Sequence, residues 1–201
     1  MASMALGGWL VFLAVGAGWR SWLQWRRTGD HGFRALSARF GSTEQITGVM
    51  LVAGAVVSVL APVLVLWGVT GTSRALAGTT SAAAGLFLVV AGIALTVKAQ
   101  LDMGASWRIG VDRAERTSLC TQGLYRFVRN PIYVGMFLVW IGEAWLVPNA
   151  LSLAGVLLMV ASIEVLVRAV EEPYLLGVHG EAYRAYTRRV GRFVPGLGRL
   201  M

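Results

Sequence analysis

Five long apolar segments alternate with polar segments along the chain. An α-helix needs about 20 mostly apolar residues to cross the hydrocarbon core of a bilayer. The segments of suitable length are Ala5–Leu23, Ile46–Trp67, Ser81–Val97, Pro131–Val147 and Asn149–Val167. The pattern therefore predicts an all-α integral membrane protein with about five transmembrane helices and a helical C-terminal segment outside the membrane.

The first apolar segment has a second interpretation, a cleaved signal peptide. No lysine or arginine precedes it, so the basic start of a signal peptide is missing. Trp19, Trp22 and Trp25 instead resemble the tryptophan belt found where helices leave a bilayer. We therefore expect this segment to be a transmembrane helix.

The composition supports a membrane protein. Of 201 residues, 56% are hydrophobic and 14% are charged, whereas a soluble domain of this length needs more polar surface. The net charge of +8 does not predict nucleic-acid binding, because the arginines lie between apolar segments. Cys120 is the single cysteine, and His31 and His179 are isolated, so we expect neither an internal disulfide nor a metal site. Arginine outnumbers lysine seventeen to one, which hints at a GC-rich bacterial genome.

The basic residues predict the orientation. Seventeen of them lie in Arg20–Gln45, in Lys98–Asn130 and in the tail from Arg168, and only Arg74 lies in a loop of the other side. The positive-inside rule then places the N-terminus outside and the tail in the cytoplasm, at the cell membrane. The fourth and fifth helices are joined by only Pro148–Asn149, which predicts an antiparallel hairpin whose open ends face the cytoplasm.

The cytoplasmic start of the fourth helix reads "LYRFVRNPIYVGM". Proline is favoured at the first position of a helix, so Asn130 is placed as the N-cap before Pro131. One interpretation is a capped membrane helix with arginines at lipid phosphates. The other is an anion site made by the helix N-terminus and its flanking arginines.

The cytoplasmic end of the fifth helix is acidic. Glu164, Arg168, Glu171 and Glu172 share one helix face. We expect Glu164 at membrane depth facing the protein interior, with a Glu164–Arg168 ion pair as the simplest arrangement. Glu171 and Glu172 repel each other, and a positively charged ligand would relieve that repulsion. Glu143 is expected to reach the outer interface and is given no role.

The tail "HGEAYRAYTRRVGRFVP" is basic and aromatic, and Tyr183 and Tyr186 share a helix face. Taken alone, it predicts an amphipathic helix lying on anionic lipid. Taken together, "GLYRFVRNPIYVG", "EEPYLL" and "GEAYRAYTRRVGRFVP" resemble isoprenylcysteine carboxyl methyltransferases and related phospholipid methyltransferases. That family's pattern is roughly G-x-Y-x-x-x-R-H-P-x-Y-x-G, a helical hairpin, E-E-x-x-L and G-x-x-Y-x-x-Y. The resemblance covers about 120–195.

The resemblance implies S-adenosylmethionine as methyl donor, bound at the cytoplasmic face. Matching positions imply that one side of the donor pocket is lined by Gly123, Tyr125, Arg129, Asn130, Pro131, Tyr133 and Gly135, and the other by Glu171 and Glu172. Arginine suits the donor's carboxylate, glutamate its ammonium or ribose, and tyrosine its sulfonium. The family usually has histidine where this chain has Asn130, and asparagine cannot titrate, so a proton-transfer role does not carry over.

Arg189 matches a basic position that the family uses near the methyl acceptor, which implies a catalytic, acceptor-binding arginine. We expect Tyr183 and Tyr186 to close the substrate site and exclude water. The acceptor is expected to be lipophilic, to come from the bilayer and to carry a carboxylate, which needs no base. The sequence divides into three N-terminal transmembrane helices over 1–100 and a methyltransferase region over 101–201, with the hairpin at 131–168.

Two other functions are considered. Membrane reductases related to steroid reductases use NADPH and carry a similar Arg-x-Pro-x-Tyr segment, but Glu171–Glu172 and the spacing of Gly180, Tyr183 and Tyr186 favour the methyltransferase. A non-enzymatic scaffold or transporter would carry polar residues through its helix interiors, and the second and third spans contain no charge. No G-x-G-x-x-G motif follows a predicted strand, so a soluble Rossmann-type domain is not expected.

Overall fold

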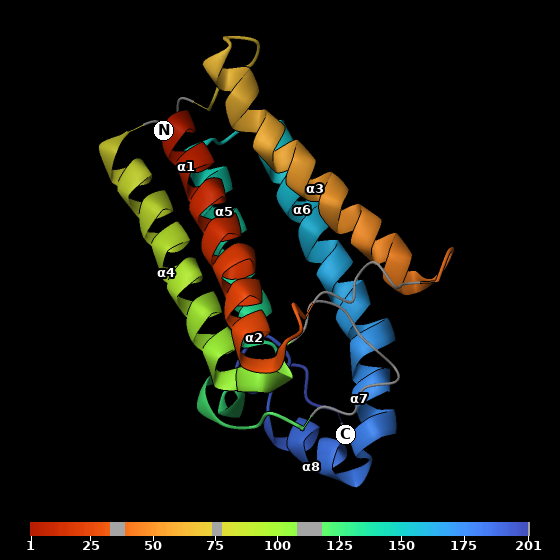
Figure 1. The fold of residues 1–201 in the computed structure, drawn as a ribbon. Helices are drawn as coiled ribbons and strands as arrows, with labels where there is room; N and C mark the ends of the chain where they lie inside the picture. The colour runs from red at the N-terminus through yellow and green to blue at the C-terminus, as the bar shows by residue number, and fades with distance from the viewer. Residues whose placement is uncertain (33–38, 74–77, 108–117, 201) are drawn as a thin grey trace.

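The computed structural model describes residues 1–32, 39–73, 78–107 and 118–200 (Figure 1). The helices are α1 (Ala2–Leu13), η1 (Ala14–Trp19), α2 (Arg20–Thr28), α3 (Thr43–Leu66), α4 (Thr79–Met103), η4 (Gly104–Ser106), η5 (Gly123–Arg126), α5 (Pro131–Leu146), α6 (Ala150–Leu166), η6 (Val167–Glu171), α7 (Glu172–His179) and α8 (Glu181–Arg189). The η1 and η6 segments are π-helical and continue their neighbours, so Ala2–Thr28 and Ala150–His179 are each one long helix. The predicted all-α fold is confirmed.

Five helices match the five predicted spans. Four of them are long and apolar enough to cross a membrane: Ala2–Thr28, Thr43–Leu66, Thr79–Met103 and Ala150–His179. The remaining one, α5, is apolar but has only 16 residues. The first and last helices are longer than predicted because they continue as helices beyond their apolar parts.

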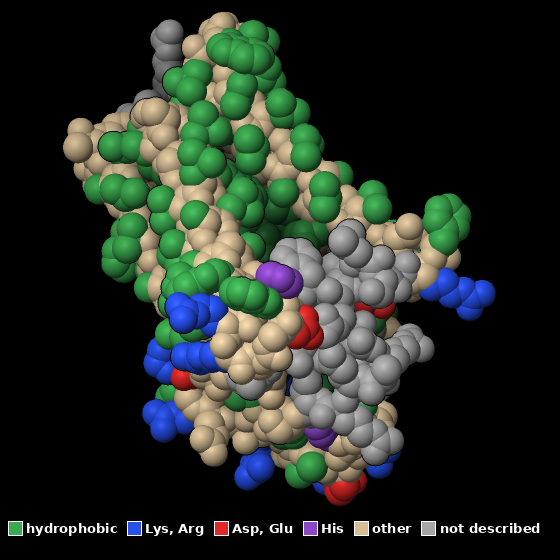
Figure 2. Space-filling view, in the orientation of Figure 1, with side chains coloured by type: hydrophobic (Ala, Val, Ile, Leu, Met, Phe, Trp, Pro, Cys, Tyr) green, Lys and Arg blue, Asp and Glu red, His purple; other side chains and the backbone are tan. Residues whose placement is uncertain are grey.

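Successive spans run in opposite directions (Figure 1). The N-terminus and the α5–α6 turn lie at one end, where the Ser73 amide donates to the Pro148 carbonyl at 2.8 Å. The segments η5, α7 and α8 lie at the other end, which we call the basic end. Lysine and arginine side chains gather there in Figure 2, while the helices above it present mostly hydrophobic side chains. The alternation agrees with the predicted topology; the cytoplasmic location of the basic end stays a prediction, and Arg74, the one basic residue assigned outside, lies beyond the described residues.

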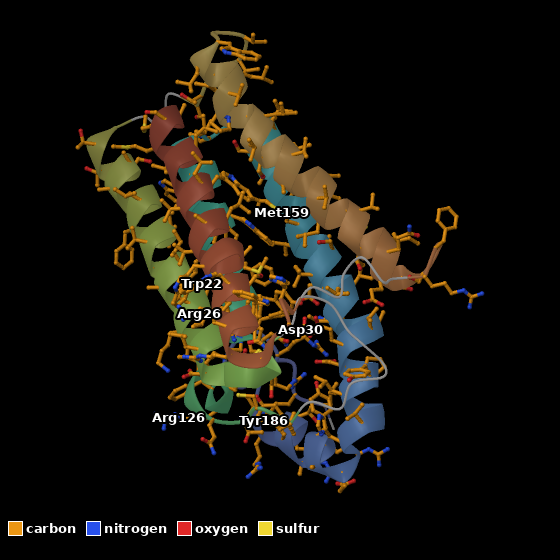
Figure 3. The ribbon with its side chains drawn as sticks, in the orientation of Figure 1. Trp22, Arg26, Asp30, Arg126, Met159 and Tyr186 are labelled. Carbon is orange, nitrogen blue, oxygen red and sulfur yellow. The ribbon has the colours of Figure 1, made fainter. Side chains whose placement is uncertain are left out.

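The predicted hairpin is formed, but its two helices have other main partners. The Asn149 side chain caps α6 by accepting from the Ser152 amide at 2.9 Å. From that turn α5 runs along α4 and α6 runs along α3, so α5 and α6 separate toward the basic end (Figure 1). A hydrophobic cluster that runs along α6 and into η6, from Val156 to Val167, packs between the two pairs, and Figure 3 labels one of its members, Met159.

Glycines explain this pairing. The backbone of Gly92 in α4 lies against the Gly135 carbonyl of α5, and Gly54 in α3 lies against the Gly155 carbonyl of α6. A side chain at Gly92 would meet that carbonyl at 2.6 Å. Small residues allow membrane helices to approach closely enough for backbone contact. The two close contacts set α4 and α5 as one pair and α3 and α6 as the other.

Two expectations about acidic residues are wrong. Glu143 does not reach the outer interface: it is 5% exposed, and its carboxylate lies against Gly8 of α1. Helix α1 covers this face of α5 because Gly8 has no side chain to hold the two apart. Glu164 forms the expected ion pair with Arg168 at 2.5 Å, but its side chain is 35% exposed and therefore does not face the interior.

Candidate active site

Three segments distant in sequence meet at the basic end. Val128 and Gly191 form a parallel β-bridge. The amides of Arg129 and Asn130 donate to the carbonyls of Gly191 and Arg192 at 2.8 and 3.1 Å. These bonds fix the tail that follows α8 against the start of α5, and the end of the α6–η6–α7 helix packs beside both.

The centre of this junction is a buried ion cluster of Arg129, Glu172 and Arg192. Arg129 Nη2 donates to Glu172 Oε1 at 2.5 Å. Arg192 donates from Nε and Nη2 to the two oxygens of the same carboxylate, at 2.7 and 2.8 Å. All three residues are at most 7% exposed. The hydrogen bonds that Arg192 donates to Glu172 raise the pKa of Arg192, so its guanidinium stays charged at neutral pH.

The two terminal nitrogens of Arg129 also bind the tail. Its Nη1 donates to the Val190 carbonyl at 2.6 Å, and its Nη2 donates to the Gly198 carbonyl at 3.1 Å. Both terminal nitrogens of the guanidinium are therefore occupied by protein, whereas the buried Nε has no hydrogen-bond partner in the described part of the chain. Arg129 and Glu172 hold the tail in place, and their contact with a donor stays a prediction.

Sequence reasoning missed Arg192. Four tail arginines, Arg184, Arg188, Arg189 and Arg192, have the same chemistry, and only the last turns inward. The signal that could have found it is Gly191: a side chain at this position would overlap the Val194 carbonyl, so the chain can fold back there only with glycine. The residue after such a turn is directed toward the α5 start.

Glu171, the neighbour of Glu172, has a different partner. Tyr133 Oη of α5 donates to Glu171 Oε1 at 2.5 Å. Within the described parts of the chain, no arginine or lysine forms an ion pair with Glu171. Glu171 ends the π-helical segment η6, and such segments in helices frequently mark functional sites.

Asn130 occupies the predicted N-cap position, with Pro131 as the first residue of α5. Its side chain, however, makes no capping bond; Nδ2 donates to the Arg192 carbonyl at 3.2 Å instead. Asn130 is therefore the N-cap residue by position, as predicted, while its side chain binds the tail. A polar residue is favoured at this position because the Arg192 carbonyl of the tail needs a hydrogen-bond donor.

The other predicted donor-site residues lie around this junction. Tyr125 is 6% exposed, and its carbonyl accepts from Tyr186 Oη at 2.6 Å. Gly123 begins η5 with a positive φ of 58°. Pro131 is buried, and Gly135 lies in the α4–α5 contact, facing Thr96. The structure thus gives these four residues packing partners within the protein, and their contact with a donor stays a prediction.

Helix α8 packs on protein through its aromatic face. Tyr183 and Tyr186 are 2% and 4% exposed, and with Val190 they form a cluster against Leu175 and neighbouring leucines. Burial raises the pKa of Tyr183 to about 12, so its hydroxyl is protonated at neutral pH. The interpretation of the tail as a helix lying on lipid is therefore wrong, because its apolar face is already covered.

Arg189 lies on the exposed side of α8. Its Nε donates to the Ala185 carbonyl of the same helix at 3.2 Å. No contact among the described residues joins it to the Arg129–Glu172–Arg192 cluster. It is therefore accessible to a ligand, and its role toward the acceptor stays a prediction.

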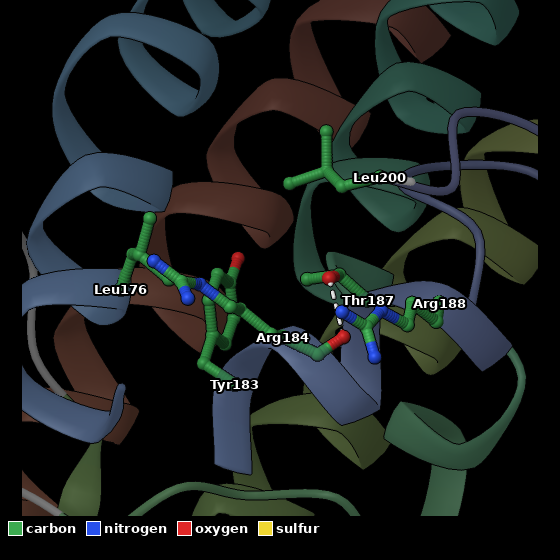
Figure 4. A pocket seen from close by; sticks show the side chains of 6 residues that line it. All are labelled: Leu176, Tyr183, Arg184, Thr187, Arg188 and Leu200. Carbon is green, nitrogen blue, oxygen red and sulfur yellow. Dashed lines mark hydrogen bonds between the residues drawn. The ribbon is translucent and has the colours of Figure 1, made fainter. Parts of the chain in front are cut away.

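A cavity of about 150 Å³ opens beside the ion cluster, between α7, α8 and the C-terminal segment (Figure 4). It is lined by Leu176, Tyr183, Arg184, Thr187, Arg188 and Leu200. The Thr187 carbonyl accepts from Arg129 Nη1 at 3.5 Å, which connects the cavity wall to the cluster. Pockets for whole cofactors measure about 300–1,000 Å³, so this cavity holds at most part of a ligand.

Comparison with known proteins gives a family. A family model described as phospholipid methyltransferase matches residues 80–182, about half of the chain. Methanethiol S-methyltransferase of Crocosphaera subtropica is 38% identical over 80 residues, which are 39% of this chain and 30% of that protein. Protein-S-isoprenylcysteine O-methyltransferase of Schizosaccharomyces pombe is 32% identical over 77 residues, 38% of this chain and 33% of that protein.

The chain spans about a third of the length of these relatives. A third relative, methanethiol S-methyltransferase of Pseudomonas deceptionensis, is 33% identical over 90 residues, 44% of this chain and 31% of that protein. Among solved structures, a eukaryotic intramembrane Ras methyltransferase, an isoprenylcysteine carboxyl methyltransferase, covers 98% of this chain and 65% of its own, with a TM-score of 0.57 and 22% identity. That likeness concerns the fold.

These findings confirm the resemblance drawn from the three motifs and do not favour the reductase or the scaffold. Because the family model matches half of the chain and the membrane fold agrees over nearly all of it, this protein belongs to the phospholipid methyltransferase family.

Proposed function

We propose that the protein transfers a methyl group from S-adenosylmethionine to a lipophilic acceptor, at the cytoplasmic face of the membrane. One observation supports the proposal most strongly. The start of α5, the Glu171–Glu172 pair and the tail meet at one end of the membrane helices, in a chain that belongs to a methyltransferase family. Family membership supports methyl transfer. The identity of the donor is inferred from the chemistry of the residues at this junction.

Glu171 and Tyr133 are the residues best suited to a cationic donor. Glu172 is neutralised by two arginines, so Glu171 is the carboxylate of the pair that remains for an ammonium group or ribose hydroxyls. The ring of Tyr133, held beside it, suits a sulfonium cation. Asn130, which joins α5 to the tail, would lie at the edge of the same pocket. Arg129 and Glu172 then support the pocket through the tail.

Bound S-adenosylmethionine supplies an activated methyl group, and displacement by the acceptor removes the positive charge on its sulfur. No proton has to move when the acceptor is a carboxylate. The protein's contribution is then to align the two reactants and exclude water. The buried Tyr183 and Tyr186 form a water-free wall on α8. Arg189, exposed on the same helix, would pair with an acidic acceptor.

A hydrophobic thiol is a second candidate acceptor, because two of the matched relatives are named for methanethiol. A thiol differs from a carboxylate in needing to lose its proton first, since a free thiol has a pKa near 8.5. Both acceptor classes therefore remain in the proposal. A lipophilic carboxylate stays the first choice because Arg189 offers it a charge partner.

The proposal is tested by binding and then by transfer. The purified protein in lipid nanodiscs is titrated separately with S-adenosylhomocysteine and with NADPH; we expect the first to bind, and binding of NADPH alone would overturn the proposal. Methyl-labelled S-adenosylmethionine is then supplied with a fatty acid or with a thiol of the same chain length. A methyl ester is hydrolysed by alkali and a methyl thioether is not, so the product identifies the acceptor class.

A further inference from the structure

The turn that ends α4 is bonded directly to the segment that leads into the candidate site. Asp102, one residue before the end of α4, has a side chain that is 14% exposed. Its Oδ2 accepts from the Leu124 amide of η5 at 3.0 Å. Its other oxygen pairs with Lys98, one turn earlier in α4. Asp102 therefore joins two segments that are 22 residues apart in sequence.

Gly123 makes the contact possible. It has a φ of +58°, which residues with a side chain rarely adopt. A Cβ atom at this position would overlap the Asp102 carboxylate. The carboxylate therefore lies on the bare backbone of Gly123 while it accepts from the next amide. This close fit is a second reason for glycine at the start of the "GLYRFVRNP" segment.

The same turn is held from its other side by the N-terminal helix. Arg20 is completely buried, and its Nη2 donates to the Gly104 carbonyl at 2.6 Å. Its guanidinium lies 4.5 Å from the centre of the Trp107 ring. Residues 1–79 lie outside the part of the chain that matches the family model. The N-terminal half thus contributes to the placement of Asp102 as well as to the membrane helices.

Only six residues separate Leu124 from Pro131, the start of α5, and several of them are fixed to the tail. The Tyr125 carbonyl accepts from Tyr186, and the amides of Arg129 and Asn130 donate to the tail backbone. A shift of η5 would therefore move the start of α5, where Tyr133 contacts Glu171, and the wall formed by α8. A change in the position of Leu124 would therefore displace residues on both sides of the candidate pocket.

We propose that Asp102 is a positioning residue for the methyl-donor pocket, which it sets by clamping Gly123 and Leu124 to the end of α4. The inference rests on the proposed function, because the ligand that reports the position is the donor's product. Asp102 itself touches neither donor nor acceptor. Its effect is carried by the η5 backbone.

The test compares three single variants in nanodiscs, by the affinity for S-adenosylhomocysteine and the donor KM. Asp102→Ala removes the acceptor of the Leu124 bond, and we expect the affinity to fall about tenfold, as for loss of a charged hydrogen bond. Asp102→Asn keeps a side-chain oxygen for Leu124, and we expect affinity within about twofold of wild type. Lys98→Gln removes the exposed ion pair but leaves the clamp, so it should also bind as wild type.

A double-mutant cycle separates the clamp from a general loss of stability. Gly123→Ala should weaken binding at least as much as Asp102→Ala, because alanine is strained at this φ and its Cβ also displaces the Asp102 carboxylate. The double variant should be no weaker than Gly123→Ala alone, because the contact with Asp102 is already lost in that variant. Additive losses would overturn the proposal, as would wild-type affinity in both Asp102→Ala and Gly123→Ala. If Asp102→Ala does not fold, the affinities of Gly123→Ala and Asp102→Asn still test the proposal. A wild-type protein that binds no S-adenosylhomocysteine would instead contradict the proposed function.

Discussion

Two adjacent carboxylates, Glu171 and Glu172, meet different partners in the folded protein. Glu172 is held by Arg129 and Arg192, whereas Glu171 accepts a hydrogen bond from Tyr133. The sequence treats them as a repelling pair that a cationic ligand would relieve. In the structure two arginines already relieve the repulsion, and they do so at one of the two positions. We therefore propose that the other, Glu171, binds the ligand.

This difference predicts opposite behaviour for the two glutamine variants. Glu171→Gln should weaken S-adenosylhomocysteine binding about tenfold, because it removes the charge offered to the donor. Its thermal unfolding should match wild type. Glu172→Gln should lower stability by about 3 kcal/mol, since it leaves two buried guanidinium groups without a carboxylate. Thermal unfolding and ligand titration of both variants check this; equal unfolding temperatures would contradict it.

The inward turn of Arg192 shows where prediction from sequence stops. The motif residues Arg129, Glu172 and Tyr133 could be identified by type and spacing. Their partners could not, because the Glu172 contacts join positions 43 and 20 residues apart, with no periodic pattern to connect them. Arg192 rather than Arg189 reaches Glu172 because α8 ends at Arg189 and the chain folds back at Gly191. Both are set by tertiary contacts.

At the scale of helices, hydrophobic length predicted the elements well and their packing poorly. All five spans are helices, and the two-residue link gives the hairpin. The pairing of α4 with α5 and of α3 with α6 could not be read from hydrophobicity, because membrane helices are apolar on every side. It depends on where glycines face one another: Gly85 and Gly92 of α4, seven residues apart, lie against Gly142 and Gly135 of α5.

The α4–α5 contact gives a prediction at this scale. Gly92→Ala places a methyl group against the Gly135 carbonyl, so we expect a loss of about 1–3 kcal/mol from overpacking and weaker donor binding as the start of α5 shifts. Gly48→Ala in α3 is the matched control, because nothing lies within 4 Å of its Cβ position. Thermal unfolding compares the two. A Gly92 variant as stable as the control would show that the contact does not set the pairing.

At the scale of the whole molecule, the basic end unites the donor pocket and an exposed arginine on α8. Under the proposed function, a water-soluble donor and a lipophilic acceptor meet there, one arriving from the aqueous side and the other from the bilayer. The proposed division is that Glu171 and Tyr133 serve the donor, while Arg189 serves the acceptor. The two sites should then be separable by mutation.

Arg189→Ala should leave S-adenosylhomocysteine affinity unchanged and abolish methyl transfer to an acidic acceptor, because its charge partner is the acceptor alone. Arg126→Ala, which removes an exposed arginine stacked on Phe127, is the control and should keep both. Donor affinity and turnover are measured side by side. If donor affinity falls with turnover, Arg189 belongs to the donor pocket.

The shortness of α5 has a consequence for the surrounding lipid. Its 16 residues span about 24 Å, against a hydrocarbon core of about 30 Å. With the α5–α6 turn at one surface, we expect the start of α5 to lie several ångströms inside the other surface of the hydrocarbon core, so the proposed donor pocket would be recessed below the headgroups. Hydrophobic mismatch of this kind is relieved by local thinning. We therefore expect donor affinity to rise in thinner, short-chain bilayers and to fall in thick ones, making membrane thickness itself a determinant of catalysis.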